Sequence, residues 1–177
     1  TLLTGPTTGE EGALLSTIPD LSPPFPFRYR EEPFLIRPVH PVCDYRAWYR
    51  LRRHFLAEKY DIIHTHSSKA GVVGRLAARS ARLHGGTKVI HTIHGLAFDS
   101  FQPWWRNMVY TAAERMCARH TDRIITVCDA MRDQARAANV GTPGQYETIY
   151  SGFDVEAFRA AAQYRQSLRK QLGIKEN

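Results

Sequence analysis

The centre of the chain alternates between short apolar runs and one longer amphipathic segment. Residues 61–65 and 88–93 are short runs rich in β-branched residues, whereas the apolar residues between positions 70 and 83 recur every three or four residues. The first pattern is typical of strands and the second of a helix. Gly85 and Gly86 follow the helical pattern, and glycine ends helices because it adopts the left-handed conformation without a steric penalty. The centre therefore predicts a strand–helix–strand unit.

Such a crossover is right-handed and joins parallel strands, so both strands end along one edge of the sheet. In open α/β sheets, ligands bind at this edge. Residues suited to binding follow each strand: His66, Ser67, Ser68 and Lys69 after the first, and His94 and Gly95 after the second. We therefore expect the functional site there.

The remaining apolar patterns continue the same alternation. They predict strands at 1–4, within 25–36, at 122–127 and at 146–150, one or two helical turns within 11–18, and helices at 44–60, about 105–120, 130–138 and near 155–158. Five prolines between Pro19 and Pro33 predict an irregular connection, because proline disrupts long regular elements. The alternation predicts an α/β fold with a doubly wound, mostly parallel, Rossmann-like sheet.

Composition limits the class of protein further. The 177 residues are 43% hydrophobic, enough for the core of one domain. No apolar run approaches the roughly 20 residues that span a bilayer, and no secretory signal is visible before the first strand, which begins abruptly, like the start of an interior fragment. Cys43, Cys117 and Cys128 are widely spaced without a CxxC pair, so we expect neither disulfides nor a cysteine zinc site, and we expect a cytoplasmic location.

An excess of positive charge narrows the expected partners. The formal net charge is +7, which favours phosphorylated substrates, an anionic lipid surface or nucleic acid. No nucleic-acid-binding module is recognisable, so we expect no nucleic acid partner. The helix at 44–60 carries several arginines, and its simplest interpretation is a solvated basic face. The alternative is that this face, with Trp48 and Tyr49, contacts an anionic membrane. The aromatic segment 98–105 allows a similar lipid contact.

The predicted edge suits a phosphate-bearing or hydroxyl-rich ligand. Ser67, Ser68 and the backbone N–H groups that open the helix form an anion-binding corner, to which Lys69 adds positive charge. A neutral imidazole at His94 can accept a hydrogen bond from a sugar hydroxyl or donate one to a phosphate. His64 and His91 fall inside strands, and we expect both to be packing histidines. No metal is expected, because no carboxylate or cysteine completes a ligand set around these histidines.

Two other enzyme classes are disfavoured. Glycoside hydrolysis uses two facing carboxylates, and near this edge the sequence offers Asp99 and Asp129 alone. Asp129 is expected to cap its helix, as Asp44 is expected to cap the helix at 44–60. A dinucleotide oxidoreductase would show a GxGxxG fingerprint after a strand, and this sequence contains none. No bound cofactor is expected.

Four segments, in this order and spacing, carry a family resemblance: DIIHTHSSKAGVVGRLAA, VIHTIHG, ER…ARHTDRIITVCDAMRDQA and ETIYSGFDVEAF. Over residues 34–160, and less closely over 1–15, the chain resembles the N-terminal, acceptor-side domain of glycosyltransferase family 4. The resemblance implies a retaining, metal-independent enzyme of GT-B architecture. It implies that His94 lies near the transferred sugar and that residues 66–69 line the acceptor side. It also implies a nucleotide-sugar as co-substrate and a glycan or lipid-linked sugar as acceptor.

The chain also departs from this family. We expect this sequence to lack the family's first strand with its glycine-rich loop and its C-terminal donor-binding domain. Cys128 and Ser151 stand where the family usually has serine and asparagine. We expect residues 1–152 to form the Rossmann-like domain and 153–177 to begin a linker toward a donor domain. The expected function is the acceptor-binding half of a retaining glycosyltransferase, inactive alone, cytoplasmic, and peripheral at the inner face of the membrane. The alternative is a non-catalytic module that binds a phosphorylated or lipid-linked sugar.

Overall fold

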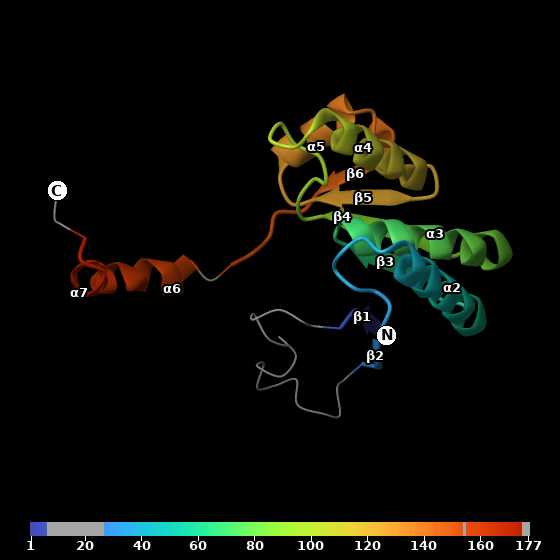
Figure 1. The fold of residues 1–177 in the computed structure, drawn as a ribbon, viewed down its shortest axis with the longest axis horizontal. Helices are drawn as coiled ribbons and strands as arrows, with labels where there is room; N and C mark the ends of the chain where they lie inside the picture. The colour runs from blue at the N-terminus through green and yellow to red at the C-terminus, as the bar shows by residue number, and fades with distance from the viewer. Residues whose placement is uncertain (7–26, 154, 175–177) are drawn as a thin grey trace.

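A four-stranded parallel sheet forms the centre of the protein (Figure 1). The computed structural model describes residues 1–6, 27–153 and 155–174. The strands are β3 (Ile62–His66), β4 (Lys88–Ile93), β5 (Arg123–Thr126) and β6 (Tyr146–Thr148), and they lie side by side in chain order. Each neighbouring pair is parallel. The predicted α/β fold with a parallel sheet is therefore confirmed.

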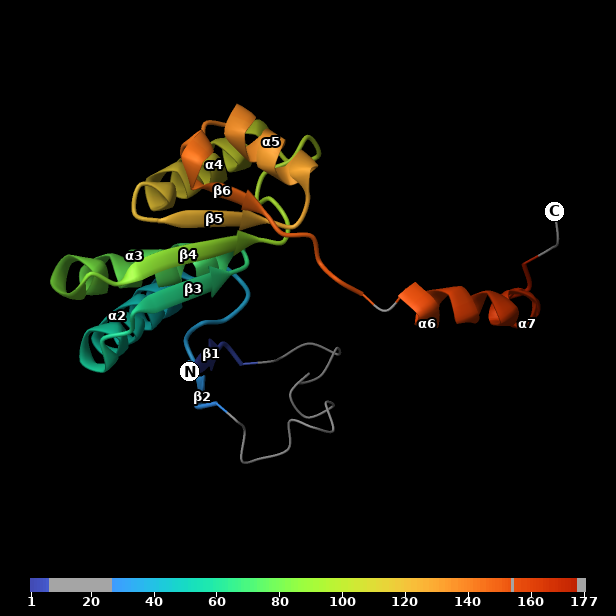
Figure 2. The ribbon, with the colours of Figure 1, turned by 180° about the vertical axis from the view of Figure 1, so that it is seen from behind.

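The helices that follow the strands pack on one face of this sheet. They are α2 (Pro41–Glu58), α3 (Ser68–Gly85), α4 (Trp104–Ala118) and α5 (Asp129–Ala137). Because the strands follow chain order, right-handed crossovers place α3, α4 and α5 on the same side. Helices α2 and α3 lie in front of β3 and β4 in Figure 1 and behind them in Figure 2, the reverse view. The opposite face of β3 is the one that carries exposed side chains.

Two apolar clusters hold this layer together. The first joins α2 and α3 to β3 and β4, and includes Leu51, Phe55, Ile63, Val73 and Val89. The second joins α4 and α5 to β4 and β5, and includes Ile93, Phe98, Ala118, Ile124 and Ala135. Alternate strand residues supply these contacts, as the two-residue period of a strand requires. The buried half of each strand is therefore fixed by packing on the helices.

Helix α3 approaches the sheet very closely at two glycines. A Cβ atom on Gly71 would lie 2.5 Å from Cε1 of His91, and one on Gly74 would lie 3.0 Å from the Thr65 side chain. The same helix carries a fully buried cation, Arg75, whose Nη2 donates to Oε2 of Glu114 on α4 at 2.7 Å. Close packing and this ion pair fix the position of α3, and with it the position of the strand ends.

Two helices begin at different residues from those predicted. Helix α2 is capped by His40, whose side chain accepts from the Cys43 N–H, and Asp44 instead accepts from the His40 N–H at 3.0 Å. Pro41 fits the first position of a helix because its missing N–H would be unsatisfied there in any case. Helix α5 begins at Asp129 itself, after the extended residue Cys128. The prediction that Asp44 and Asp129 are N-cap residues was therefore wrong.

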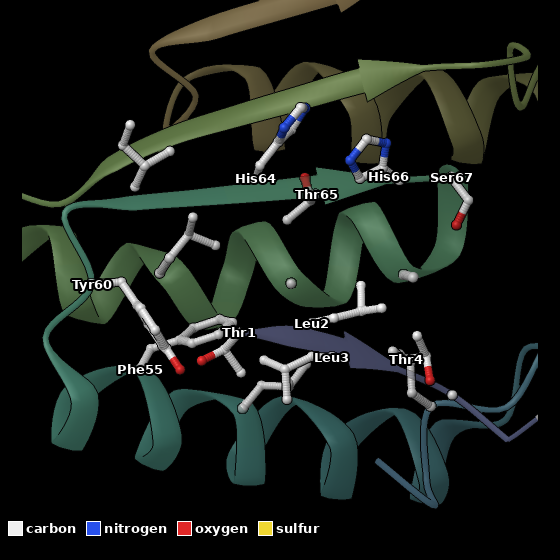
Figure 3. Close-up of a pocket in the computed structure, with 17 residues that line it drawn as sticks. Thr1, Leu2, Leu3, Thr4, Phe55, Tyr60, His64, Thr65, His66 and Ser67 are labelled. Atoms are coloured by element: carbon white, nitrogen blue, oxygen red, sulfur yellow. The ribbon is translucent and has the colours of Figure 1, made fainter. Parts of the chain in front are cut away.

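Strands β1 (Leu2–Thr4) and β2 (Tyr29–Glu31) form a separate parallel pair. Both were predicted as strands, but among the described residues they do not join the four-stranded sheet. A cavity of about 660 Å³ separates β1 from β3 (Figure 3), with Leu2, Leu3, Ile62 and Ile63 in its lining. The helical turns predicted within 11–18, and most of the connection predicted between 19 and 33, lie outside the described residues.

The chain leaves the sheet after β6. It continues through α6 (Val155–Ala160), a 3-10 turn (Ala161–Tyr164) and α7 (Arg165–Gln171), which lie away from the sheet in both views (Figures 1 and 2). The short helix predicted near 155–158 is confirmed. Among the described residues, no helix has both the length and the apolar character needed to cross a membrane.

Candidate functional site

Three histidines line up on the sheet face opposite α3, at the carboxyl ends of β3 and β4. His64 and His66 project from the same side of β3, and Ser67 lies at the end of the strand (Figure 3). The His64 and His66 ring centroids are 4.3 Å apart, and His94 stacks on His66 at 5.3 Å. Nδ1 of His66 and Nε2 of His94 lie 3.0 Å apart, within hydrogen-bond distance. The structure thus brings together two of the residues predicted for this site.

The contact between His66 and His94 sets what the pair can do chemically. When both rings are neutral, one of the two facing nitrogens carries the hydrogen and the other accepts it. The two outward nitrogens then differ, so the pair presents one donor and one acceptor to a ligand. Partial burial, followed by the neighbouring His64 and His94, lowers the pKa of His66. Burial and His94 likewise lower the pKa of His64, which favours neutral rings at physiological pH.

Thr92 fixes the third ring of this row. Nε2 of His64 lies 2.8 Å from Oγ1 of Thr92 on β4. His64 was predicted to be a packing histidine, but its side chain is exposed among the described residues. The correction follows from strand geometry, because Ile63 and Thr65 face the helices and place His64 on the other side.

His91 shows the opposite outcome and confirms the packing prediction. It is buried under α3, with Nδ1 at 2.9 Å from Oγ1 of Thr65. Burial, with the positive charge of Arg75 as the next cause, lowers the pKa of His91 to about 3. This ring is neutral at physiological pH and belongs to the core.

Ser67 joins β3 to α3 in a backbone conformation that is rare outside glycine, with φ 60° and ψ 162°. Such a conformation costs on the order of 1–3 kcal/mol and is found mainly at functional sites. Its carbonyl accepts the N–H of Gly71 at 2.9 Å, closing the first turn of α3. Its side chain makes no capping hydrogen bond, which leaves the hydroxyl at the mouth of the site.

Ser68 and Gly95 lie beside Ser67, whereas Lys69 is turned toward α2. Ser67, Ser68 and Gly95 all line a very small cavity near the strand ends. The Lys69 ammonium donates to the carbonyl of Ile36 at 2.6 Å and to that of Pro38, and lies 2.5 Å from Oδ1 of Asp44. Its charge is therefore largely balanced within the protein.

The two carboxylates weighed against a hydrolase serve local structure. Asp99 accepts a hydrogen bond from the Gln102 side chain and others from the N–H groups of Phe101 and Gln102, and these bonds, the side-chain one first, lower the pKa of Asp99. Asp129 accepts from the Tyr150 hydroxyl at 2.7 Å and pairs with Arg132 at 2.7 Å. Over the described part of the chain, no group of three His, Cys, Asp or Glu residues is placed to hold a metal ion.

Sequence reasoning missed Thr92 and the buried pair of Arg75 and Glu114. Thr92 could have been found, since it lies on the same strand face as the residue paired with His64. Arg75 and Glu114 are 39 positions apart, and no local pattern links them. The unusual backbone conformation of Ser67 also could not be predicted, because serine is common at helix starts in ordinary conformations.

A parallel sheet with histidines and a helix start at its carboxyl edge is typical of a Rossmann-like ligand-binding domain. Among the described residues the helices cover one face of this sheet, whereas the predicted doubly wound fold has helices on both faces. The sequence profile of Glycosyltransferase Family 4 matches residues 10–157, and the chain belongs to that family. This confirms the resemblance identified from the four sequence segments.

Individual relatives have related activities. The chain is 35% identical over 145 residues to the UDP-Gal:alpha-D-GlcNAc-diphosphoundecaprenol alpha-1,3-galactosyltransferase of Escherichia coli, an alignment that covers 82% of this chain and 37% of that protein. It is 30% identical over 125 residues to the D-inositol 3-phosphate glycosyltransferase of Mycobacterium ulcerans, covering 66% of this chain and 25% of that protein. The chain therefore spans between a quarter and just over a third of the length of these two relatives.

A solved structure gives the same fold. The crystal structure of Anabaena HepE in complex with UDP and glucose matches 97% of this chain and 49% of its own, with a TM-score of 0.57 and 19% sequence identity. The similarity supports the predicted GT-B architecture, of which this chain supplies about half.

Proposed function

We propose that this chain is the acceptor-binding half of a retaining glycosyltransferase that moves a hexose from a nucleotide-sugar to a sugar on a polyprenyl diphosphate. The observation that carries the proposal is the coupled pair of His66 and His94 beside the start of α3. The galactosyltransferase relative, by its name, acts on GlcNAc-diphosphoundecaprenol. An acceptor of that type presents sugar hydroxyls and two phosphates, which match imidazoles and a helix start.

In the proposed complex, the acceptor sugar lies over the histidine row and its diphosphate lies at the start of α3. The N-terminal turn of a helix favours negative charge, and the Ser67 hydroxyl is available beside it. His94 orients the attacking hydroxyl by accepting its hydrogen bond, while His66 fixes the His94 tautomer. Positioning of this kind can supply a large part of a rate enhancement without covalent catalysis.

In the transfer step, the acceptor oxygen bonds to the anomeric carbon as the bond from that carbon to the nucleotide phosphate oxygen breaks. The hydroxyl proton passes to the departing phosphate oxygen, so atoms and charge balance. We propose that the donor is held mainly by a second domain, that residues 1–152 form the acceptor domain, and that 153–177 lead toward the donor domain. The isolated chain then binds acceptor without transferring sugar.

We also propose that the protein works at the inner face of the membrane, where a lipid-linked acceptor is available. An exposed aromatic group at the start of α4 supports this, with Phe101 96%, Trp104 74% and Trp105 50% exposed. Aromatic side chains of this kind favour the interface between water and lipid. The basic face of α2 contributes less than its sequence suggested, because Arg50 pairs at 2.9 Å with the buried Glu32 and Arg52 donates to Ser80.

The proposal is tested by titrating the 177-residue chain with the methyl ester of GlcNAc-diphosphate, which carries the head group without a lipid chain. We expect saturable binding in calorimetry, weakened at least fivefold by His66→Ala and by His94→Ala. His120→Ala, which removes a histidine from outside the edge, is the matched control and should leave the affinity unchanged. Equal effects of all three substitutions would contradict the proposed site.

A second measurement tests whether a separate domain is needed to bind the donor. UDP-galactose, added to the chain together with this acceptor, is expected to give no disaccharide product. Product formed by the isolated chain would overturn the proposal that a separate domain must hold the donor.

A further inference from the structure

An apolar groove runs over the outer surface of α3, between α2 and α4. Its volume is about 600 Å³, within the roughly 300–1,000 Å³ of pockets that bury small organic ligands. Its lining is mostly apolar and includes Tyr45, Trp48, Val72, Leu76, Tyr110 and Ala113. None of the residues assigned above to the acceptor sugar, His66 and His94, lies in it, so the groove is a distinct surface.

One end of the groove reaches the candidate site. Ser68, Ala97 and Glu114 line both the groove and the small cavity that also contains Ser67 and Gly95. The groove therefore adjoins the start of α3, where the proposed ligand places its phosphates. Lys69 and Asp44 also line this end of the groove and form an ion pair, with Nζ of Lys69 2.5 Å from Oδ1 of Asp44. Because their charges cancel, they add little net charge to the groove.

We propose that this groove binds the first isoprenoid units of a polyprenyl diphosphate acceptor. The inference rests on the proposed function and adds the site for the hydrocarbon part of the same ligand. The continuity between groove and candidate site supports this occupant, because a polyprenyl diphosphate joins an apolar chain directly to an anion. A concave groove also fits a single isoprenoid chain better than it fits a bilayer. A bilayer surface is broad and would instead contact the exposed aromatic residues at the start of α4.

Trp48 in the groove provides a direct reporter. The chain contains three tryptophans, and Trp104→Phe with Trp105→Phe leaves Trp48 as the single one. Farnesyl diphosphate is the probe, because it carries three isoprene units and a diphosphate without sugar. We expect a saturable blue shift of Trp48 emission on titration, and no comparable shift with inorganic pyrophosphate, which lacks the chain.

Two neighbouring alanines on α4 give a matched pair of variants. Ala113 lines the groove, whereas Ala112 is exposed and lies outside it. Ala113→Phe should fill the groove and raise the dissociation constant for farnesyl diphosphate at least tenfold, while Ala112→Phe should leave it unchanged. Val72→Thr, which keeps the size of the side chain and makes it more polar, should raise the constant two- to threefold and does not depend on tolerating extra bulk.

Several results would overturn the inference. These are equal affinity of the Ala113→Phe and Ala112→Phe variants, binding of pyrophosphate as tight as that of farnesyl diphosphate, or a Trp48 response to phosphatidylglycerol vesicles but not to farnesyl diphosphate. The last result would assign the groove to the bilayer. If the GlcNAc-diphosphate ester still responds to the histidine substitutions, only the groove assignment fails; if it does not, the proposed function itself fails.

Discussion

The two faces of the central sheet use the same residue type for opposite purposes. His91 on β4 faces α3, is buried against Gly71, and has its pKa lowered to about 3 by burial. His66 on the neighbouring strand faces the other way, is exposed, and contacts His94. Residue type and strand position alone therefore do not distinguish a core histidine from a binding one. The helix layer decides it, because each strand turns alternate residues toward that layer.

Under the helices, an unpaired charge would lower the free energy of unfolding most. Arg75 has no exposed side-chain surface, and its Nη1 has no hydrogen-bond partner among the described residues. Removing one partner of such a pair leaves an uncompensated buried charge. On this comparison, substitutions under the helices should change stability, whereas substitutions on the open face should change binding.

The largest effect is expected for Glu114→Gln. The substitution leaves the Arg75 cation buried without its counter-ion and should lower the free energy of unfolding by about 3–5 kcal/mol. Urea denaturation followed by circular dichroism measures it. Glu156→Gln is the control, because the pair of Glu156 and Arg159 is exposed and exposed pairs contribute about 0–1 kcal/mol. Comparable losses in both variants would remove the distinction between buried and exposed charge.

The pH dependence of stability should come next in size. Because the folded-state pKa of His91 is about 3 and the unfolded value is about 6.5, the unfolded chain binds the extra proton first as pH falls. The contribution of neutral His91 to the free energy of unfolding is therefore present above about pH 6.5 and is lost progressively toward pH 3. Between pH 6.5 and 4.5 this amounts to roughly 2–3 kcal/mol.

His91→Gln tests this assignment by removing the titrating group while keeping a side chain that can hydrogen-bond Thr65. Urea denaturation at several pH values should show a shallower acid slope for this variant than for the unsubstituted chain. His64→Gln, on the opposite face, should change the slope less, because His64 is more exposed than His91. An unchanged slope in His91→Gln would mean that other groups cause the acid sensitivity.

Ser67→Gly should separate stability from binding at the boundary between the two faces. Glycine adopts a positive φ without strain, so the variant should gain on the order of 1 kcal/mol in unfolding free energy. Loss of the hydroxyl should weaken binding of the GlcNAc-diphosphate ester severalfold. Ser100→Gly, in an exposed turn, is the control. A variant that is less stable than the parent would show that the Ser67 backbone is not strained.

The sequence predicted the elements of the fold well because periodicity is local. The helix after β3 and the parallel neighbours β3 and β4 followed from the spacing of apolar residues, and the edge that joins His66 to His94 followed from the handedness of the crossover. The separation of β1 from β3 could not be predicted, since it depends on which strands meet in space. The start of α2 was misplaced because His40, rather than Asp44, caps the helix, and the start of α5 was misplaced because Cys128 occupies the cap position without a side-chain hydrogen bond.

The candidate site was predictable in position but only partly in detail. Lys69 was expected to serve an anion, yet it meets Asp44, which lies 25 positions earlier and on another helix. Such pairing is tertiary and leaves no local pattern. The two-residue period of a strand could not assign His64, because Ile62 and Ile63 are adjacent isoleucines on opposite faces and the sequence does not tell which of them is buried.

The smallest expected effect tests whether the outer surface of the helix layer serves only to cover the sheet. Phe101→Ser with Trp104→Ser should reduce sedimentation of the chain with phosphatidylglycerol vesicles about threefold, since membrane affinity scales with buried apolar area. Phe158→Ser is the control, because Phe158 is 69% exposed but lies on α6, away from the start of α4. A loss confined to the double variant would place lipid on the helix side, while the histidine face stays free for the sugar. Equal pelleting of all variants would remove the membrane from the proposed function.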